Sequence, residues 1–185
     1  PDLGQSMLII LTWLALIFVS GINLVIFFGL FGFFITIIFY LIFFVDKFNY
    51  IKIRITSFFD NSSNSYSQAE KASEAIIDGG FFGKGIGEGT LNSRIPEAHT
   101  DFIVSVISEE FGIVIILLLM LAFIFFAYNV FKKIRDTNDN VYKMVLVGLV
   151  TLLLMQVFIH VGVNLRILPT TGMTLPYLSY GGSSI

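Results

Sequence analysis

The N-terminal stretch most constrains the fold, because no charged side chain occurs between Leu3 and Val45. This run spans 43 residues, whereas one helical crossing of a bilayer needs about 20. Small and polar residues interrupt it once, at 20–23 (Ser-Gly-Ile-Asn). Backbone polar groups in lipid must bond within their own segment, which favours helices. We therefore predict a hairpin of two membrane helices, over about 6–23 and 25–45.

Two further apolar segments predict additional crossings. A third helix is expected over about 102–131 and a fourth over about 144–163. Charged residues make up only 13% of the chain, where a soluble domain has roughly 25%. The predicted fold class is an all-α polytopic integral membrane protein, a helical bundle with a long extracytoplasmic loop at 46–101. We expect residues 1–185 to form a single membrane domain.

Charge and cysteine content exclude several kinds of function. The net charge is −2, so nothing indicates a surface for nucleic acid. The chain contains no cysteine, which excludes a disulfide framework, a thiolate nucleophile and a Cys-based metal site within it. The apolar composition also excludes an ordinary cytosolic enzyme and a disordered tail.

Basic residues predict which side of the membrane each loop occupies. The short loop between the last two predicted helices carries Lys132, Lys133, Arg135 and Lys143. Short loops rich in Lys and Arg stay in the cytoplasm, so counting crossings places 46–101 and the tail after Asn164 outside. Three basic residues at the start of the outer loop oppose this rule, which weakens for long loops: Lys47, Lys52 and Arg54.

The outer loop combines segments with different patterns. Residues 46–60 are amphipathic and are predicted to lie along the membrane interface, and 68–77 are predicted to form a short helix. Residues 79–89 are rich in glycine, but they match neither phosphate-loop nor dinucleotide-binding spacing. We interpret them as a tight turn packed on the membrane surface. The alternative is that Lys84 contacts an anionic lipid head group.

Three polar residues share one face of the fourth predicted helix, because Gln156, His160 and Asn164 recur at i, i+4 and i+8. Polar side chains in a span rarely face lipid. We expect this polar stripe to hydrogen-bond to neighbouring helices, and the alternative is a transport path. Glu109 and Glu110 are expected to be solvated residues near a helix start, where the helix dipole favours carboxylates.

Asp101 is the most informative ionisable residue. It lies where the outer loop meets the third predicted helix, and Glu97 and His99 precede it within five positions. The helix dipole stabilises a carboxylate at a helix start, which is a purely structural explanation. Titratable side chains clustered at the rim of a bundle also indicate a catalytic site. Such a carboxylate could accept a proton from a substrate whose lipid tail lies in the bilayer.

Several strings of residues together resemble a known family. They are PDLG at 1–4, GKGIGEG at 83–89, PEAHTDF at 96–102, SEEFG at 108–112 and LPTTGMTLPYLSYGGSS at 168–184. In this order they are similar to the FtsW/RodA family, also called the SEDS proteins. That family has ten membrane helices in the bacterial inner membrane, so the chain is expected to correspond to its C-terminal half without the last helix. The resemblance also implies an active site on the outer face.

The resemblance implies a peptidoglycan glycosyltransferase. Such an enzyme polymerises lipid II: a sugar hydroxyl attacks the anomeric carbon of a lipid-linked disaccharide with inversion, and undecaprenyl diphosphate leaves. The family's essential Asp matches Asp101, with the implied role of general base. The resemblance implies substrate-binding roles for Arg54, Gln68, Lys71, Lys84, Arg94, Glu97, His99, Thr170 and Ser183, with Arg166 as a further cation. No cofactor is identifiable, and a divalent cation at the diphosphate stays open because no set of metal ligands is recognisable.

The chain departs from the family pattern at a few positions. Lys71 replaces a common Gln, and His160 replaces a common Asn. Thr171 replaces the Lys of many FtsW proteins and is more RodA-like. The TLP at 174–176 and the GEG at 87–89 are more FtsW-like, so the resemblance favours the septal enzyme of cell division over the elongation enzyme.

Two other functions stay open on the sequence alone. A lipid II flippase would use the polar stripe as a path, although transporters usually place charges near the midplane of the membrane. A non-catalytic scaffold would bind a division partner through exposed apolar surfaces. The resemblance implies lipid II, a class B penicillin-binding protein (a transpeptidase), other divisome proteins and the lipid bilayer as partners, and no nucleic acid.

Overall fold

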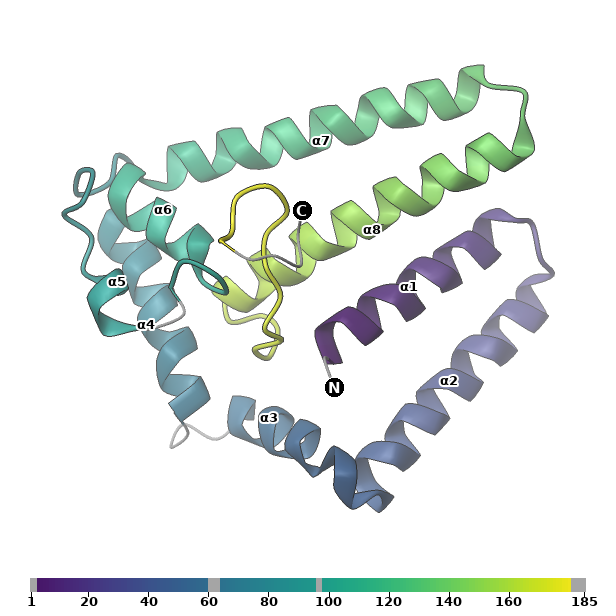
Figure 1. Cartoon of the computed structure of the whole chain (residues 1–185), viewed down its shortest axis with the longest axis horizontal. Helices are drawn as coiled ribbons and strands as arrows, with labels where there is room; N and C mark the ends of the chain where they lie inside the picture. Colours follow the sequence, from purple (N-terminus) through teal and green to yellow (C-terminus); the bar gives the residue numbers. More distant parts are fainter. Residues whose placement is uncertain (1–2, 60–63, 96–97, 181–185) are drawn as a thin grey trace.

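The computed structural model describes residues 3–59, 64–95 and 98–180, and the regular structure in these ranges is entirely helical. The elements in order are α1 (Leu3–Val19), α2 (Leu24–Phe44), the 3₁₀ helix η1 (Asp46–Phe48), α3 (Asn49–Phe59), α4 (Asn64–Gly79), α5 (Leu91–Arg94), α6 (Ile103–Phe111), α7 (Ile113–Asp136) and α8 (Asn140–Asn164). Figure 1 shows the four long helices α7, α8, α1 and α2, with α3 to α6 gathered at one end of them. The predicted all-α fold class is confirmed.

Helices α1 and α2 form the predicted hairpin. The first ends at Val19, before the predicted end at residue 23. Gly21 then continues the chain with a φ of 79°, in the left-handed region where glycine meets no steric penalty. The Asn23 side chain caps α2 by accepting a hydrogen bond from the Val25 N–H at 2.9 Å. The small and polar residues of the turn therefore both end one helix and start the next.

Within the described ranges, three helices are long and apolar enough to cross a membrane: α2, α7 and α8. Helix α1 is apolar but has only 17 residues, which gives a length of about 26 Å at 1.5 Å per residue. No residue of α2 is buried, as expected for a helix surrounded mostly by lipid, whereas α1 buries Leu8 and Leu14. The structure thus provides three candidate crossings and a shorter fourth helix.

Both turns between long helices lie at the same end of the bundle (Figure 1). They are 20–23 and 137–139, and in the second the Asp139 carboxylate caps α8 by accepting from the N–H groups of Val141 at 2.8 Å and Tyr142 at 3.3 Å. The shorter helices and the C-terminal tail lie at the opposite end (Figure 1). This grouping agrees with the predicted parity of the loops, and which end faces outside stays a prediction.

The single helix predicted over 102–131 is wrong. Gly112 divides it into α6 and α7, and its φ of 83° turns the chain between them. A Cβ atom at Gly112 would collide with the carbonyl oxygen of Phe81, so this close approach of the outer loop requires glycine. Hydropathy did not reveal the break, because an uncharged run carries no information about a change in chain direction.

Helix α4 packs on α6 through small residues. Ala69, Ala72 and Ala75 are buried at one-turn spacing and share a cluster with Phe102 and Val106 at the start of α6. Small side chains allow two helices to approach closely. The helix predicted at 68–77 is therefore present within α4, and its packing holds α6 in place at this end of the bundle.

Candidate active site around Asp101

Asp101 lies in a turn immediately before α6, as predicted for a carboxylate at a helix start. The residue is half-buried, and its carbonyl oxygen accepts a hydrogen bond from Asn164 Nδ2 at 3.1 Å. Its carboxylate lies beside the C-terminal tail (residues 165–180), because Asp101 Oδ2 is 3.8 Å from where a Cβ would stand on Gly172. Asp101 is thus placed between the end of α8 and the tail.

The polar stripe on α8 binds the tail. Gln156 Nε2 donates to the carbonyl oxygen of Thr174 at 2.9 Å, and His160 Nδ1 lies 2.8 Å from that of Met173. A carbonyl oxygen only accepts, so Nδ1 of His160 carries the proton in this contact. The expected hydrogen bonds between helices are therefore corrected for these two residues, because their partners are backbone carbonyls of the tail.

The tail is also fastened to the residues just before α6. Ser179 Oγ donates to the carbonyl oxygen of Thr100 at 2.8 Å and accepts from the Leu175 N–H at 2.8 Å. The Tyr180 N–H donates to the carbonyl oxygen of His99 at 3.1 Å. The tail therefore connects α8 with the segment that carries Asp101, an arrangement that the sequence did not predict.

Arg54 reaches the same part of the tail from α3. Its Nη1 donates to the carbonyl oxygen of Thr170 at 3.4 Å, two residues before Gly172. Gly4 at the beginning of α1 also lies here, because a Cβ on it would be 3.1 Å from a backbone oxygen of the tail. One short piece of the tail thus contacts three segments that are distant in the sequence, among them those of Asp101 and Arg54.

Arg166 has an unusual backbone conformation. Its φ of 57° lies in the left-handed region, which costs a non-glycine residue about 1 kcal/mol. The residue directly follows the C-cap of α8, where chains commonly adopt this conformation with glycine. Its Nη1 lies 3.9 Å from Glu70 Oε1 on α4, a partly exposed pair that adds little stability. The end of α8 therefore carries a cation two residues after Asn164.

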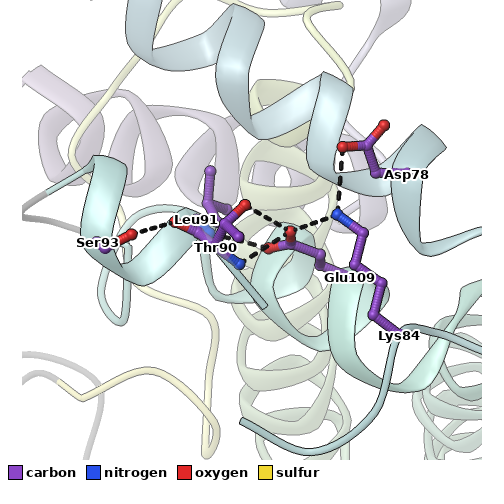
Figure 2. A network of polar contacts seen from close by, with 6 residues as sticks. All are labelled: Asp78, Lys84, Thr90, Leu91, Ser93 and Glu109. Atoms are coloured by element: carbon purple, nitrogen blue, oxygen red, sulfur yellow. Dashed lines mark hydrogen bonds and ion pairs between the residues drawn. The ribbon is translucent and has the colours of Figure 1, made fainter. Parts of the chain in front are cut away.

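Glu109 is buried on α6, so the prediction of a solvated residue is wrong. Figure 2 shows its carboxylate at the centre of a polar network. Lys84 Nζ donates to Glu109 Oε1 at 2.9 Å and to Asp78 Oδ2 at 3.3 Å. The N–H groups of Thr90 and Leu91 each donate to the carboxylate at 3.0 Å. This network ties the outer loop to α6.

Both ionic partners of the network are held in their charged forms. Burial alone would raise the pKa of Glu109, but the hydrogen bonds from Thr90, Lys84 and Leu91 outweigh it and lower this pKa from 4.5 to about 2. The hydrogen bond to Glu109 raises the pKa of Lys84 above its ordinary value. Lys84 is therefore bound to Glu109, which lies near the end of α6, whereas Asp101 lies just before the start of that helix. We do not place Lys84 among the cations nearest Asp101.

The glycine-rich loop packs against the end of α6. The Gly85 N–H donates to the carbonyl oxygen of Glu110 at 3.1 Å, and a Cβ at Gly83 would collide with the Glu110 backbone. Three apolar side chains of the loop are more than 70% exposed: Phe81, Phe82 and Ile86. The glycines thus serve a close approach to α6, and contact of the loop with the membrane surface stays a prediction.

The remaining predicted substrate-binding residues are spread over the same end of the molecule. Gln68 and Lys71 are half-buried on α4, while Arg94 at the end of α5 and His99 are exposed. Two predicted positions lie outside the described residues: Glu97 and Ser183. Among the side chains that the structure describes, no three or more His, Cys, Asp or Glu come together in a way that could hold a metal ion.

A groove of about 390 Å³ lies between α7, α8 and the tail. Its walls include the apolar side chains of Phe126, Leu153 and Pro176. Gln156 also lines it, but the amide of this residue already donates to the tail. Because none of the predicted site residues lines the groove, we do not assign the active site to it.

Known proteins are similar in sequence to this chain over its full length. The sequence model of the FtsW/RodA/SpoVE family, described as "Cell cycle protein", matches residues 1–185. A "Probable peptidoglycan glycosyltransferase FtsW" from Caulobacter vibrioides is 36% identical, over 100% of this chain and 47% of the relative. A protein of the same name from Nitrosomonas europaea is 34% identical, over 100% and 49%. The chain spans about half the length of the curated relatives it matches.

The fold also matches a solved structure, described as "Structural coordination of polymerization and crosslinking by a peptidoglycan synthase complex". The TM-score is 0.77 at 26% sequence identity, and the match covers 100% of this chain and 52% of the solved one. The sequence comparison and the fold comparison therefore indicate the same family over the whole length of the chain. The chain is a multi-pass membrane protein and belongs to the FtsW/RodA/SpoVE family of SEDS proteins.

Proposed function

We propose that the protein is a peptidoglycan glycosyltransferase that polymerises lipid II into glycan strands, with Asp101 as its general base. The observation that carries the proposal is the position of the Asp101 carboxylate beside Gly172, on the tail segment to which Arg54 is bonded. A base and a cation that both contact one short segment of the tail fit a reaction in which a hydroxyl loses a proton and a diphosphate leaves. The two relatives are named as probable peptidoglycan glycosyltransferases, which supports the same class of reaction.

The proposed step is a displacement at the anomeric carbon of the donor sugar, with inversion. The oxygen of the acceptor 4-hydroxyl bonds to that carbon while the bond from the carbon to the diphosphate oxygen breaks. The hydroxyl proton moves to the Asp101 carboxylate, and undecaprenyl diphosphate leaves with the electron pair. Cations stabilise the charge of the leaving group. Arg54 and Arg166 are our candidates because Arg54 bonds to the tail near Gly172 and Arg166 directly follows the C-cap of α8, whereas Lys84 is held by Glu109 in the outer loop.

The polar stripe favours an enzyme over a lipid II flippase. A transport path needs polar side chains that are free to contact the substrate. Gln156 and His160 are buried instead, and each is bonded to a backbone carbonyl of the tail. Gln156 and His160 therefore bind the tail that lies beside Asp101.

Within the family we propose the septal role in cell division, with a class B penicillin-binding protein as the partner that crosslinks the strands. The relatives carry the name FtsW, and the matched solved chain belongs to a complex described as coordinating polymerization and crosslinking. Elongation of the side wall is the alternative, because Thr171 is the more RodA-like residue. Depletion that stops elongation while septa still form would support that alternative.

Polymerisation of labelled lipid II in vesicles tests the function. The full-length protein, reconstituted with a class B penicillin-binding protein, should convert lipid II into glycan polymer. Translocation of lipid II across the bilayer without polymer would point to a flippase. If neither polymer nor translocation is observed, a non-catalytic scaffold is the remaining function. Translocation without polymer and the absence of both would each contradict the proposal.

Cysteine labelling tests the proposed orientation of the site. Ser93→Cys should react with an impermeant thiol reagent added from outside, and Asn138→Cys should not, because the helix ends on both sides of Asn138 carry four basic residues. Both positions are exposed, so the reaction reports the side of the membrane and not burial. The opposite pattern would place Asp101 in the cytoplasm and contradict the proposed outer site.

A further inference from the structure

Helix α6 begins without a cap from its own residues. The N-cap residue is Phe102, and no side-chain hydrogen bond caps the helix from that position. The first N–H groups of a helix have no partner within it, and Ser, Thr, Asp or Asn usually supplies one from the N-cap. The side chain of phenylalanine has no hydrogen-bond acceptor. The first turn of α6, which directly follows Asp101, therefore depends on an acceptor from elsewhere in the fold.

Asn164, the last residue of α8, supplies that acceptor. Its Oδ1 accepts from the Ser105 N–H at 3.2 Å and from Ser105 Oγ at 2.7 Å. Its Nδ2 donates to the carbonyl oxygens of Asp101 at 3.1 Å and His160 at 2.8 Å. These four bonds use the full capacity of a side-chain amide, and the residue is 0% exposed.

The partners define the orientation of this amide. Its nitrogen faces two carbonyl oxygens, which only accept, and its oxygen faces an N–H and an O–H of Ser105. A flipped amide would bring donors against donors and acceptors against acceptors. Asn164 therefore holds the backbone on both sides of Phe102, at the Asp101 carbonyl and at the first turn of α6.

We propose that Asn164 is the positioning residue of Asp101. The carbonyl and the carboxylate of Asp101 share one Cα, so a fixed carbonyl restricts where the carboxylate can stand. A neutral amide achieves this without adding a charge beside the base. The inference rests on the proposed function, and it adds α8 to the elements that build the active site, although Asn164 itself does not touch the substrate.

Asn164→Leu tests this role, because it keeps the size of the side chain and removes all four bonds. In the full-length protein with its class B penicillin-binding protein, kcat for lipid II polymerisation should fall about 10- to 10²-fold. KM for lipid II should change by less than about threefold, because substrate binding is not involved. Ser105→Ala is the matched control: it removes one bond to the same amide, leaves the bond to Asp101, and should keep kcat within about threefold of wild type.

A second comparison separates positioning from general stability. If Asn164 acts through Asp101, Asn164→Leu should not lower further the residual rate of an Asp101→Asn protein. An equal fold-loss in both backgrounds, or an unchanged kcat in folded Asn164→Leu, would overturn the positioning role. Wild-type polymerisation by Asp101→Asn would instead overturn the proposed base, so the two failures are distinguishable.

Asn164→Ser keeps the test decisive should the leucine variant not accumulate in the membrane. Its hydroxyl can bond back to the His160 carbonyl, one turn earlier on α8, but it is too short to replace the bond to the Asp101 carbonyl. The same loss of kcat with little change in KM is expected. A serine variant with wild-type kcat would overturn the positioning role.

Discussion

Asp101→Asn should reduce the initial rate of lipid II polymerisation by at least about 10²-fold, the lower end of what general-base catalysis contributes. Asparagine keeps the size of the side chain and its hydrogen bonding but cannot accept a proton. The backbone bond from Asn164 to the Asp101 carbonyl does not depend on the side chain, so the local fold should be preserved. Labelled lipid II in vesicles that contain the full-length protein and a class B penicillin-binding protein provides the measurement.

Glu110→Gln is the control for a general loss of negative charge. It removes one carboxylate from α6, the helix that follows Asp101, at a half-buried side chain beside the glycine-rich loop. If charge alone mattered, both variants would lose similar activity. Comparable rates for the two variants, or inactivity of Asp101→Asn that follows loss of folded protein from the membrane, would contradict a base at Asp101.

Glu109→Ala should have the largest effect on stability. It removes the acceptor of two backbone N–H groups, on Thr90 and Leu91, and also the partner of the Lys84 ammonium. Buried donors without a partner cost about 1–3 kcal/mol each, so the variant should lose at least about 2 kcal/mol. The thermal midpoint in detergent should fall by several degrees, whereas Glu110→Gln should stay within about 0.5 kcal/mol of wild type.

The same carboxylate predicts a dependence of stability on pH. The pKa of Glu109 is about 2 in the folded protein, below its ordinary value of 4.5. As the pH falls, the unfolded state takes up the proton first, so the stabilising contribution is present in full above about pH 5 and is lost between about pH 4.5 and pH 2. The midpoint difference between wild type and Glu109→Ala should shrink across that window. A difference that stays constant down to pH 3 would contradict the ionised network.

Hydropathy located the long helices for a physical reason. A chain in lipid must satisfy its backbone internally, so an apolar run has few alternatives to a helix. Helix α2 begins at Leu24 and α8 at Asn140, one and four residues before their predicted starts, and each has a capping side chain immediately before it. The break at Gly112 was missed because it depends on the approach of Phe81, a contact with a distant loop.

Glu109 illustrates a signal that was available but not decisive. The N-cap and three residues of α6 recur at the spacing of one helical face, and all four are buried: Phe102, Ser105, Val106 and Glu109. That spacing indicates a core-facing position. A buried carboxylate needs partners, however, and Lys84 and Thr90 come from a loop whose path the sequence pattern does not reveal.

The candidate site was predictable only in part. Asp101 could be identified because titratable side chains cluster beside a helix start, a local pattern. The bond from Arg54 to Thr170 joins residues 116 positions apart, and that from Asn164 to Asp101 joins residues 63 apart. Such contacts depend on how the tail returns across the end of the bundle, which spacing along the chain does not encode.

We propose that this protein forms glycosidic bonds from lipid II, with Asp101 as the base. The most direct test measures, in the same vesicles, the undecaprenyl diphosphate released and the glycosidic bonds formed by the full-length protein with its partner. We predict that one undecaprenyl diphosphate is released for each bond formed, and that both fall together in Asp101→Asn by at least about 10²-fold. Lipid II that crosses the bilayer without release of the diphosphate, or release that continues at the wild-type rate in Asp101→Asn, would contradict the claim.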